Sequence, residues 1–507
     1  MIAQEITELT AVDRGCTAIE RTDLSRPVAL VLDDGLLTPE TTFFDYGCGR
    51  GGDLSRLTER GYDVAGWDPA YRPDGKLRSS DVVNLGFVIN VIEDPSERAQ
   101  VLRSAWALTR SVLVVAARPD WDARSVSGRP YGDGILTAKG TFQRFYAQEE
   151  LRAWIDDVLG VRSIAAAPGI FYVFREDVRA QTFLAARVRR RPAVRPRAPA
   201  PRRPSVSETL YEVNRTVLDP IVAFVEARGR PPELFELPEA AAAQEQFGSV
   251  RAALAIVRRV TGDAAWRAAR QAATEDLTVY LALAAFGGRP RFTGLPEDIQ
   301  VDVKAFFDSY KEACTAADAL LFRAGDQSAI DKACRSSLIG KLTPTALYVH
   351  VTALPRLDSL LRVYEGCGRA LTGTVDRANI IKLNRIEPKV GYHVYPDFDH
   401  DPHPVLEASV RADLKRLHVK YRDFTKSVNP PILHRKETFV SEDYPGRDKF
   451  ARLTAQEERL GLLADTASIG TRERWEQLIA SKGLRFMSHR LVRSKSPLHA
   501  ASNQSSL

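Results

Sequence analysis

The sequence predicts an α/β N-terminal domain built on a mostly parallel sheet with an antiparallel last strand, then a helical region and a mixed α+β C-terminal domain. Three observations predict this arrangement. In residues 1–185, short apolar runs alternate with helical patterns, as in parallel strands joined by crossover helices. Residues 206–345 are rich in alanine and leucine at helical spacing. Residues 346–507 mix both patterns and hold all 8 histidines.

The composition is that of an ordinary soluble globular protein, with 44% hydrophobic and 27% charged residues. A length of 507 residues predicts about two to four domains. No run reaches the ~18–20 apolar residues of a membrane helix, and the first ten residues do not resemble a secretory signal, so we expect no membrane partner. The 5 cysteines form no CxxC pair, which argues against a disulfide framework or a cysteine zinc site and favours a cytoplasmic location.

The elements of the first domain follow in order along the chain. We expect strands and helices in these places: strands at 43–47, 63–68, 81–89 and 111–117, and helices at 54–60, 96–109 and 148–158. Two more strands, 161–167 and 170–176, are separated only by Pro168-Gly169, and so short a turn makes them antiparallel. Only twelve residues separate Asp68 from Asp81, too few for a helix and another strand, so we expect an edge strand to be missing.

One short segment carries most of the net charge of +6. Residues 187–203 hold eight arginines and no acidic residue, and the prolines between 192 and 204 favour an extended linker. The segment is either a solvated spacer or a tether that contacts nucleic-acid phosphates, with Arg189, Arg190 and Arg191 as candidates. This linker suggests four parts: a first domain (1–185), the linker (186–205), a helical domain (206–345) and a mixed C-terminal domain (346–507) with a disordered tail.

The strongest chemical signal is the stretch FFDYGCGRGGD at 43–53. A strand runs into Gly47, Gly49 and Gly51, a helix follows, and glycines there allow a ligand to approach the backbone closely. The second strand ends at Asp68, where a carboxylate can accept hydrogen bonds from both hydroxyls of a ribose. The glycines are two residues apart, unlike the G-x-G-x-x-G pattern of dinucleotide sites.

This DxGxGxG form resembles motif I of the class I S-adenosylmethionine-dependent methyltransferases, whose domain is Rossmann-like. The resemblance implies S-adenosylmethionine as cofactor, with Asp45 near its amino-acid portion and Asp68 on its ribose. The stretch at 90–118 and the strand at 170–176 are similar to later parts of the same superfamily. The full set of cofactor-binding candidates, including two for the adenine, is Asp45, Gly47, Cys48, Gly49, Gly51, Asp68, Asp81 and Asn84.

Longer stretches resemble one family, the bacterial DNA phosphorothioation-associated methyltransferases. They include AIERTDLSRPVALVLDDGLL, GDGILTAKGTFQRFYAQEEL, NPPILHRKETFV and IGTRERWEQLI, so the resemblance spans nearly the whole chain. It implies transfer of a methyl group, most simply to DNA, in a DNA-modification system whose other proteins are candidate partners. An alternative is a module of the same system that binds the cofactor and DNA or a partner without transferring a methyl group.

Substrate contacts are expected in the long segment after the strand at 111–117, because ligands lie beyond the carboxyl ends of parallel strands. Its basic and aromatic residues could hold phosphate and stack a base. The candidates are Arg124, Arg129, Tyr131, Lys139, Arg144 and Tyr146. The alternative is a lid with no substrate contact, or core packing for the helix at 148–158. No general base stands out, and alignment alone can carry methyl transfer.

Two further patterns need an interpretation. Asn429-Pro430-Pro431-Ile432 resembles the NPP[YFW] motif of adenine amino-methyltransferases, but its fourth residue is not aromatic and we interpret it as a turn. The stretch HVYPDFDHDPHP at 393–404 has residue types that bind divalent metals, but Asp- and Pro-rich loops commonly supply their own turn hydrogen bonds. We favour a structural or nucleic-acid-facing loop and predict no metal site. The stretch from His434 to Glu437 is either a phosphate contact or a solvated helix or strand face, and we favour the solvated face.

Overall fold

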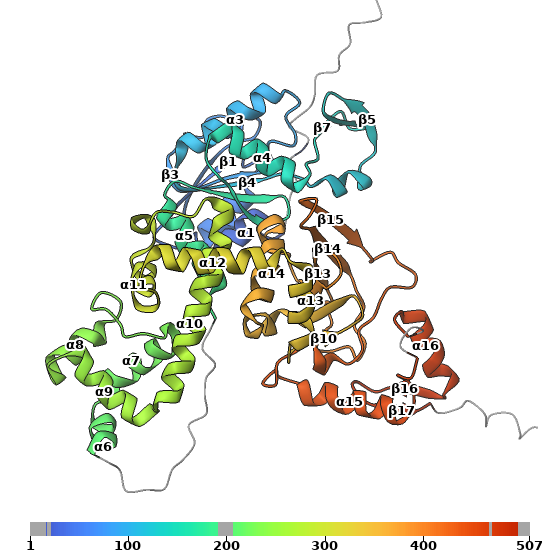
Figure 1. Ribbon diagram of the computed structural model, residues 1–507. Helices are drawn as coiled ribbons and strands as arrows, with labels where there is room; N and C mark the ends of the chain where they lie inside the picture. Colours follow the sequence, from blue (N-terminus) through green and yellow to red (C-terminus); the bar gives the residue numbers. More distant parts are fainter. Residues whose placement is uncertain (1–16, 18–21, 191–205, 466–468, 495–507) are drawn as a thin grey trace, which may run out of the picture. The chain divides into compact units, whose positions relative to one another are not determined.

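In the computed structural model (Figure 1), the described residues are 17, 22–190, 206–465 and 469–494. They form two compact units. One draws on residues 1–173 and 327–507, and the other on residues 174–326. The predicted division into four parts stays a prediction about which of them fold independently.

The first sheet carries the N-terminal α/β domain, and its strand order is β2-β1-β3-β4-β9-β8. β1 is parallel to β2 and β3, β3 is parallel to β4, and β8 is antiparallel to β9. The strands are β1 (Thr42–Tyr46), β2 (Asp63–Trp67), β3 (Ser80–Gly86), β4 (Thr109–Ala116), β8 (Ile164–Ala167) and β9 (Ile170–Phe174). The predicted fold class is confirmed. β2 is itself the edge strand of this sheet among the described residues, so the strand that was expected to be missing beyond it is not there.

Helices cover this sheet. Successive side chains of a strand point to opposite faces, and these strands carry apolar side chains on both faces, so both faces must be covered. α3 packs against β3, β4 and α4, and its Leu102 and Ala105 share a buried cluster with Phe44, Val83 and Leu113 from the sheet. α1 packs against β3 and β4, and α2 against β2. The helices are α1 (Arg26–Asp33), α2 (Gly52–Glu59), α3 (Pro95–Leu108) and α4 (Gln148–Leu159).

The segment between β4 and α4 has more regular structure than the predicted long loop. It forms a 3-10 helix and a small antiparallel sheet of order β5-β6-β7. Its elements are η2 (Asp120–Ser125), β5 (Gly128–Tyr131), β6 (Gly134–Thr137) and β7 (Phe142–Gln143). Phe142 and Tyr146 are buried, so packing rather than solvent exposure places these aromatic residues.

A second sheet, fully antiparallel, has its strands in chain order from β10 to β15. Its strands are β10 (Lys341–Leu342), β11 (Ala346–His350), β12 (Ile380–Asn384), β13 (Lys389–Val394), β14 (Ala408–Asp413) and β15 (His418–Asp423). Two helices and a 3-10 helix accompany it: α13 (Gln327–Ser336), η5 (Val351–Arg356) and α14 (Ser359–Thr372).

α14 contacts both sheets, because it packs against β13 and β14 and also against β8. Its last turn is followed by Gly373, where an added Cβ would lie 2.4 Å from the backbone nitrogen of Ala167. The next residue, Thr374, donates its N–H to the carbonyl of Ala166 at 2.7 Å. The first sheet and the C-terminal part are therefore joined by backbone contact, which only a glycine permits at this distance.

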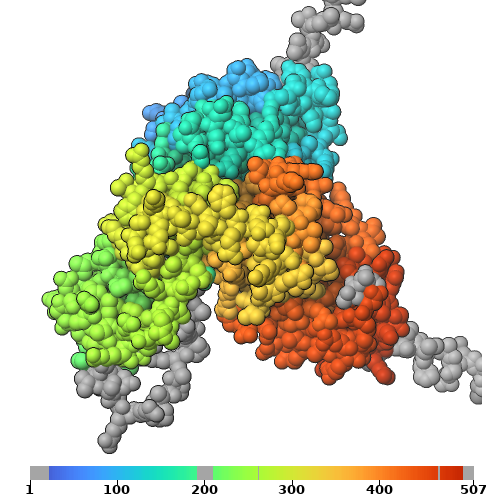
Figure 2. All heavy atoms as spheres, viewed as in Figure 1, coloured from blue at the N-terminus to red at the C-terminus, as the bar shows by residue number. Residues whose placement is uncertain are grey.

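The C-terminal elements pack beside the second sheet, as the orange and red spheres of Figure 2 show. They comprise η6 (Lys436–Thr438), α15 (Arg447–Arg459), α16 (Arg472–Ser481), β16 (Leu484–Phe486) and β17 (Leu491–Arg493). Buried Phe398, Phe439 and Phe450 fill one cluster, and Leu453, Leu462 and Trp475 belong to another. The predicted mixed α+β character of this region is confirmed.

After Phe174, which ends β9, the regular elements described in the unit of residues 174–326 are all helices. The α-helices of this unit are α5 (Asp177–Val188), α6 (Val206–Val213), α7 (Arg215–Arg228), α8 (Pro238–Phe247), α9 (Val250–Thr261), α10 (Asp263–Ala284), α11 (Glu297–Phe306) and α12 (Tyr310–Ala324), with 3-10 turns η3 (Ala285–Gly287) and η4 (Phe292–Gly294). The predicted helical region, 206–345, is helical up to Ser336, but α13 belongs to the other unit and Lys341–Leu342 form β10. Among the described helices, none combines the length and the apolar character that crossing a bilayer requires.

Candidate functional site

The glycine-rich turn between β1 and α2 has the conformation that its sequence predicts. Gly47, Gly49 and Gly51 have φ angles of 85°, 51° and 80°, in the left-handed region that glycine adopts without strain. An added Cβ at Gly47 would also lie 2.4 Å from the side chain of Val88. The N–H groups of Gly47 and Cys48 bond to the carbonyl of Trp67 at 2.8 and 3.1 Å, which ties the turn to the end of β2.

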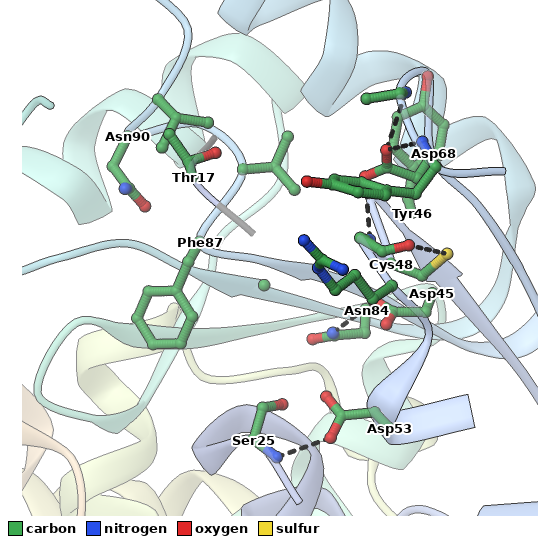
Figure 3. Close-up of a pocket in the computed structure, with 18 of the residues that line it drawn as sticks. Thr17, Ser25, Asp45, Tyr46, Cys48, Asp53, Asp68, Asn84, Phe87 and Asn90 are labelled. Atoms are coloured by element: carbon green, nitrogen blue, oxygen red, sulfur yellow. Dashed lines mark hydrogen bonds between the residues drawn. The ribbon is translucent and has the colours of Figure 1, made fainter. Parts of the chain in front are cut away.

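A cavity of about 980 Å³ lies beside this turn, at the carboxyl ends of β1, β2 and β3 (Figure 3). This is the edge where ligands bind in open parallel sheets. Of the eight predicted cofactor residues, six line the cavity: Asp45, Gly47, Cys48, Gly49, Asp68 and Asn84. Gly51 is the residue just before α2, and its left-handed backbone forms part of the turn outside the cavity wall.

Asp68 both holds the loop after β2 and faces the cavity. Its Oδ2 accepts the N–H of Gly49 at 2.9 Å, and its Oδ1 accepts those of Ala70 and Tyr71 at 2.9 Å. A carboxylate offers about four lone-pair sites, so three bonds leave capacity for a ligand hydroxyl. The carboxylate is thus oriented before any ligand arrives.

Asp45 and Asn84 form a buried polar pair on the floor of the cavity. Asn84 Nδ2 donates to Asp45 Oδ1 at 2.8 Å, and the two side chains are 3% and 5% exposed. In Figure 3 the amide of Asn84 lies directly beside the Asp45 carboxylate. Asn84 Oδ1, in contrast, is buried and has no hydrogen-bond partner among the described residues. An unpaired buried acceptor of this kind suits a ligand that brings a donor.

The thiol of Cys48 is held in its neutral form. Burial, reinforced by the carboxylates of Asp45 and Asp68, raises its pKa to about 12. Because the thiolate is the reactive form, Cys48 stays a neutral wall of the cavity at physiological pH.

Asp81 does not lie at the cavity, which corrects its prediction as an adenine contact. It stands near the amino end of β3, and its Oδ2 accepts the N–H and the hydroxyl of Thr42 at 2.9 and 2.6 Å. Ligands gather at the carboxyl ends of parallel strands, so a residue that begins a strand lies at the wrong edge. Asn84, near the end of the same strand, lines the cavity, and its contact with the adenine stays a prediction.

The opposite side of the cavity holds residues that the sequence did not reveal. Phe87 follows β3 with a φ of 62°, a conformation that is rare for an aromatic residue. Asn90 is 2% exposed, and its Oδ1 has no hydrogen-bond partner among the described residues. The predicted strand at 81–89 was too long. Because β3 ends at Gly86, Phe87 and Asn90 lie in the segment after the strand, where they line the cavity.

The segment after β4 reaches the cavity through residues other than those predicted. Arg118, Asp122 and Gln143 line it, with Arg118 within 3.4 Å of both Asp122 Oδ2 and Gln143 Oε1. Gln143 Oε1 also accepts from Asn90 Nδ2 at 3.3 Å. Through these contacts, side chains from two separate stretches of the chain form one hydrogen-bonded polar cluster in the cavity wall.

The predicted substrate candidates of this segment lie elsewhere. The prediction that Tyr146 contacts substrate is wrong, because its ring is 2% exposed in the core and its hydroxyl accepts a hydrogen bond from Arg98 at 3.1 Å. Arg144 pairs with Asp133 and Glu150. The remaining candidates stand outside the cavity wall: Arg124, Arg129 and Lys139 are exposed, and Tyr131 packs edge-on against Phe142.

In the linker, two of the three predicted nucleic-acid contacts bind carboxylates of the helical unit. Arg189 pairs with Asp298 at 2.9 Å, and Arg190 pairs with Glu275 at 2.7 Å and Asp276 at 3.0 Å. Arg191 and the rest of the linker lie outside the described residues, as does the predicted tail from Ser494 beyond its first residue.

The two remaining sequence patterns have structural partners. Asn429 Oδ1 accepts the N–H of Glu473 at 3.0 Å in the first turn of α16, and Pro431 bridges to Thr471, so this stretch anchors a helix. In the loop at 393–404, Asp401 Oδ1 accepts the N–H of His403 at 2.9 Å, an own-turn hydrogen bond of the expected kind. The predicted solvated face at 434–437 is wrong, because His434 and Lys436 are 6% and 1% exposed.

No family model matches the chain, and no curated protein matches it. Among solved structures, the chain is similar to the amino pentose methyltransferase CalS10 from Micromonospora echinaspora, solved with bound SAM (17% identity, 32% of this chain and 94% of that chain, TM-score 0.24).

Two more solved structures are similar to the chain over nearly the same share of its length. They are the sugar N-methyltransferase KedS8 from a Streptoalloteichus species (17% identity, 29% of this chain and 84% of that chain, TM-score 0.23) and 1,6-didemethyltoxoflavin-N1-methyltransferase from Burkholderia thailandensis, solved with S-adenosylhomocysteine (14% identity, 29% and 75%, TM-score 0.21).

Proposed function

We propose that the chain is an S-adenosylmethionine-dependent methyltransferase whose cofactor binds in the cavity at the ends of β1, β2 and β3. One observation carries the proposal: a β1–glycine turn–α2 unit with three left-handed glycines stands beside a cavity of about 980 Å³. The cavity is at the upper end of the range for small-molecule sites, roughly 300–1,000 Å³, so it has room for a cofactor and part of an acceptor.

The residues present fit the cofactor. Asp68 would hold the ribose hydroxyls with the acceptor capacity that its loop leaves free, and the turn at Gly47 and Gly49 would let the adenosyl group approach the backbone. Asp45, fixed by Asn84, offers a carboxylate near the expected position of the amino-acid portion. When bound, S-adenosylmethionine supplies an electrophilic methyl group. The chain's own residues orient the reactants and exclude water.

The side of the cavity formed by Phe87 and Asn90 favours a substrate with N–H donors. The Oδ1 atom of Asn90 is buried and has no hydrogen-bond partner among the described residues, and such an atom costs free energy unless a ligand donates to it. Phe87 adds an aromatic wall beside it. A nucleobase has both a flat ring and N–H donors. Together with the family resemblance, this supports DNA as the methyl acceptor and an association with bacterial DNA phosphorothioation.

Calorimetric titration of the full chain with S-adenosylmethionine tests cofactor binding. We expect saturable binding, and a loss of at least about tenfold in affinity for Asp68→Ala, because the turn and the ribose contact both depend on this carboxylate. Asp63→Ala is the matched control, since Asp63 is an exposed acid at the other end of the same strand. Absence of binding by the wild-type chain would overturn the proposal.

Transfer is tested separately with a tritiated methyl group and duplex DNA, with and without phosphorothioate linkages. Radioactivity in the DNA supports the methyltransferase. Cofactor binding without transfer to DNA, RNA or protein would instead show a cofactor-binding module that carries out no chemistry.

A further inference from the structure

Three ligand-type side chains meet in the interior of the C-terminal part, far along the chain from the glycine turn. His403, His434 and Glu457 are 7%, 6% and 1% exposed. One nitrogen or oxygen of each lies within 4.8 Å of the corresponding atom in the other two. Buried charged and polar groups are rarely brought together unless they satisfy one another or a bound ion.

The backbone fixes this meeting through a set of short bridges. Val405 pairs with Ile432, and Pro431 pairs with Thr471, so the segments that contain His403 and His434 lie against each other. Leu433 N–H also bonds to the carbonyl of Pro404 at 3.1 Å. Glu457 comes from α15, the helix beside these segments. Three stretches of chain therefore present one side chain each to the same point.

The hydrogen bond that His434 makes leaves its other ring nitrogen available as a metal ligand. His434 Nε2 is 2.8 Å from the carbonyl oxygen of Ile469, which requires the proton on Nε2 and leaves a lone pair on Nδ1. That Nδ1 is buried and has no hydrogen-bond partner among the described residues. A backbone carbonyl that fixes the histidine tautomer is the usual support behind a metal-binding imidazole.

The other two residues face each other. His403 Nε2 lies 2.7 Å from Glu457 Oε1, yet that oxygen also lacks a partner of good hydrogen-bond geometry in the described part of the chain. Around a tetrahedral zinc ion with bonds of about 2.0–2.1 Å, neighbouring ligand atoms stand about 3.3 Å apart. The spacing here, from 2.7 Å to at most 4.8 Å, brackets that value.

We propose that His403, His434 and Glu457 bind a divalent transition-metal ion. Two imidazole nitrogens and one carboxylate oxygen suit zinc and its neighbours in the first row, whereas magnesium and calcium prefer sites made of oxygen alone. Three protein ligands leave one tetrahedral position for water or another group.

The surroundings hold the two imidazoles firmly and leave a path to them. The ring of Trp475 lies 4.7 Å from that of His403 and 4.5 Å from that of His434, between ring centres. A separate cavity of about 330 Å³ is lined by His403 and Trp475, which gives an ion access to the site. The three N–H donors of nearby Lys436 are taken by the carbonyls of Phe398 and Asp401 and by His489 Nε2.

Metal content of the full chain, prepared without a histidine tag and exchanged into metal-free buffer, tests the site. We expect about one zinc ion per chain on titration, and visible absorption typical of tetrahedral coordination when Co²⁺ replaces zinc. Zinc at one equivalent should also raise the melting temperature.

Variants connect the signal to the three residues. Glu457→Gln keeps the shape of the side chain and should weaken zinc binding at least about tenfold while circular dichroism stays that of the wild type. His434→Ala should remove the cobalt absorption. His400→Ala is the control, because His400 is an exposed histidine three residues from His403.

The opposite result has a clear structural meaning. Wild-type protein without a cobalt absorption band and without stabilisation by zinc would show that the cluster is a hydrogen-bonded core. A metal signal retained in both Glu457→Gln and His434→Ala would place the ion elsewhere. Cofactor binding at the glycine turn is unaffected by either outcome, so the two proposals fail independently.

Discussion

His350 is a buried titratable residue far from the glycine turn. Its ring is 6% exposed and lies 4.8 Å from that of Phe398 and 5.1 Å from that of Tyr444, between ring centres. Its Nδ1 accepts the N–H of Thr352 at 3.3 Å, which needs a free lone pair. Burial lowers its pKa to about 4. The folded protein therefore keeps this imidazole neutral well below pH 6.5.

This histidine predicts acid sensitivity. Between pH 6.5 and pH 4 the unfolded chain binds a proton at this position and the folded chain does not, so stability falls as the pH falls through this window. From pH 7 to pH 5 the contribution of His350 is at most about 2 kcal/mol. Urea denaturation at both pH values should show a smaller difference for His350→Phe than for the wild type. An unchanged difference would contradict the neutral, buried imidazole.

At the level of single residues, the sequence could predict those that a local motif determines. Asp45, Gly47, Gly49 and Asp68 follow from the order of strand, glycines and helix, and all four line the cavity. Phe87 and Asn90 could not be predicted, because their place depends on where β3 stops. The pairing of His403 with Glu457 depends on contacts between segments more than fifty residues apart in sequence, which no local pattern encodes.

Several elements of the helical unit are joined by a buried network of ion pairs. Arg230, 2% exposed, binds Glu236 and Asp302, each at 2.6 Å. Arg228 reaches Asp302 at 2.8 Å and Asp298 at 2.9 Å. The network ties α7 to α11 and to the segment between α7 and α8.

Removing the central cation should destabilise this unit. Arg230→Met leaves two buried carboxylates short of a partner, at a cost of about 3 kcal/mol or more. Guanidinium denaturation followed by circular dichroism should show an earlier helical transition. Arg258→Met removes an exposed pair with Asp263 in the same unit and should leave that transition nearly unchanged. Equal effects of the two variants would show that the buried network adds nothing.

Regular elements were predictable where one period of apolar residues dominated. The parallel strands and the antiparallel β8–β9 pair were confirmed for that reason. The β5-β6-β7 sheet was missed because its strands are only two to four residues long and only β5 is mostly exposed, so no alternation of apolar and polar residues develops. In such a hairpin sheet, tertiary packing of Phe142 decides the structure more than local preference does.

The arginine-rich linker predicts how the binding of DNA by the whole molecule depends on salt. Because Arg189 and Arg190 are already paired with carboxylates, contact with DNA would fall mainly to the later arginines of the segment. Those are Arg191, Arg195, Arg197, Arg202 and Arg203. Each phosphate contact adds about 0.9 to the slope of log affinity against log salt concentration.

Replacing four of these arginines by glutamine should therefore reduce that slope by up to about 4 units, measured by fluorescence anisotropy on duplex DNA across a salt series. The variant combines Arg195, Arg197, Arg202 and Arg203. A variant with the same loss of charge, at exposed positions of the helical unit, is the control and should keep the wild-type slope. It combines Arg251, Arg259, Arg267 and Arg323. Equal slopes for the two variants would favour the solvated spacer.

The joining of the first sheet to the C-terminal part was not predictable. A linear reading of composition suggests domains in series, whereas residues 327–507 return to the unit that residues 1–173 begin. One contact of this return brings Gly373 against Ala167, two small residues whose meeting needs the three-dimensional arrangement of α14 and β8.

This meeting has a consequence for synthesis on the ribosome. The backbone of Ala166 and Ala167 receives its partners only after Gly373 and Thr374 have left the exit tunnel, about 200 residues later. At bacterial and eukaryotic elongation rates this delay is roughly 10–40 seconds. During that time the outer strand of the nascent first sheet remains uncovered, which makes it a natural place for a chaperone to protect the growing polypeptide.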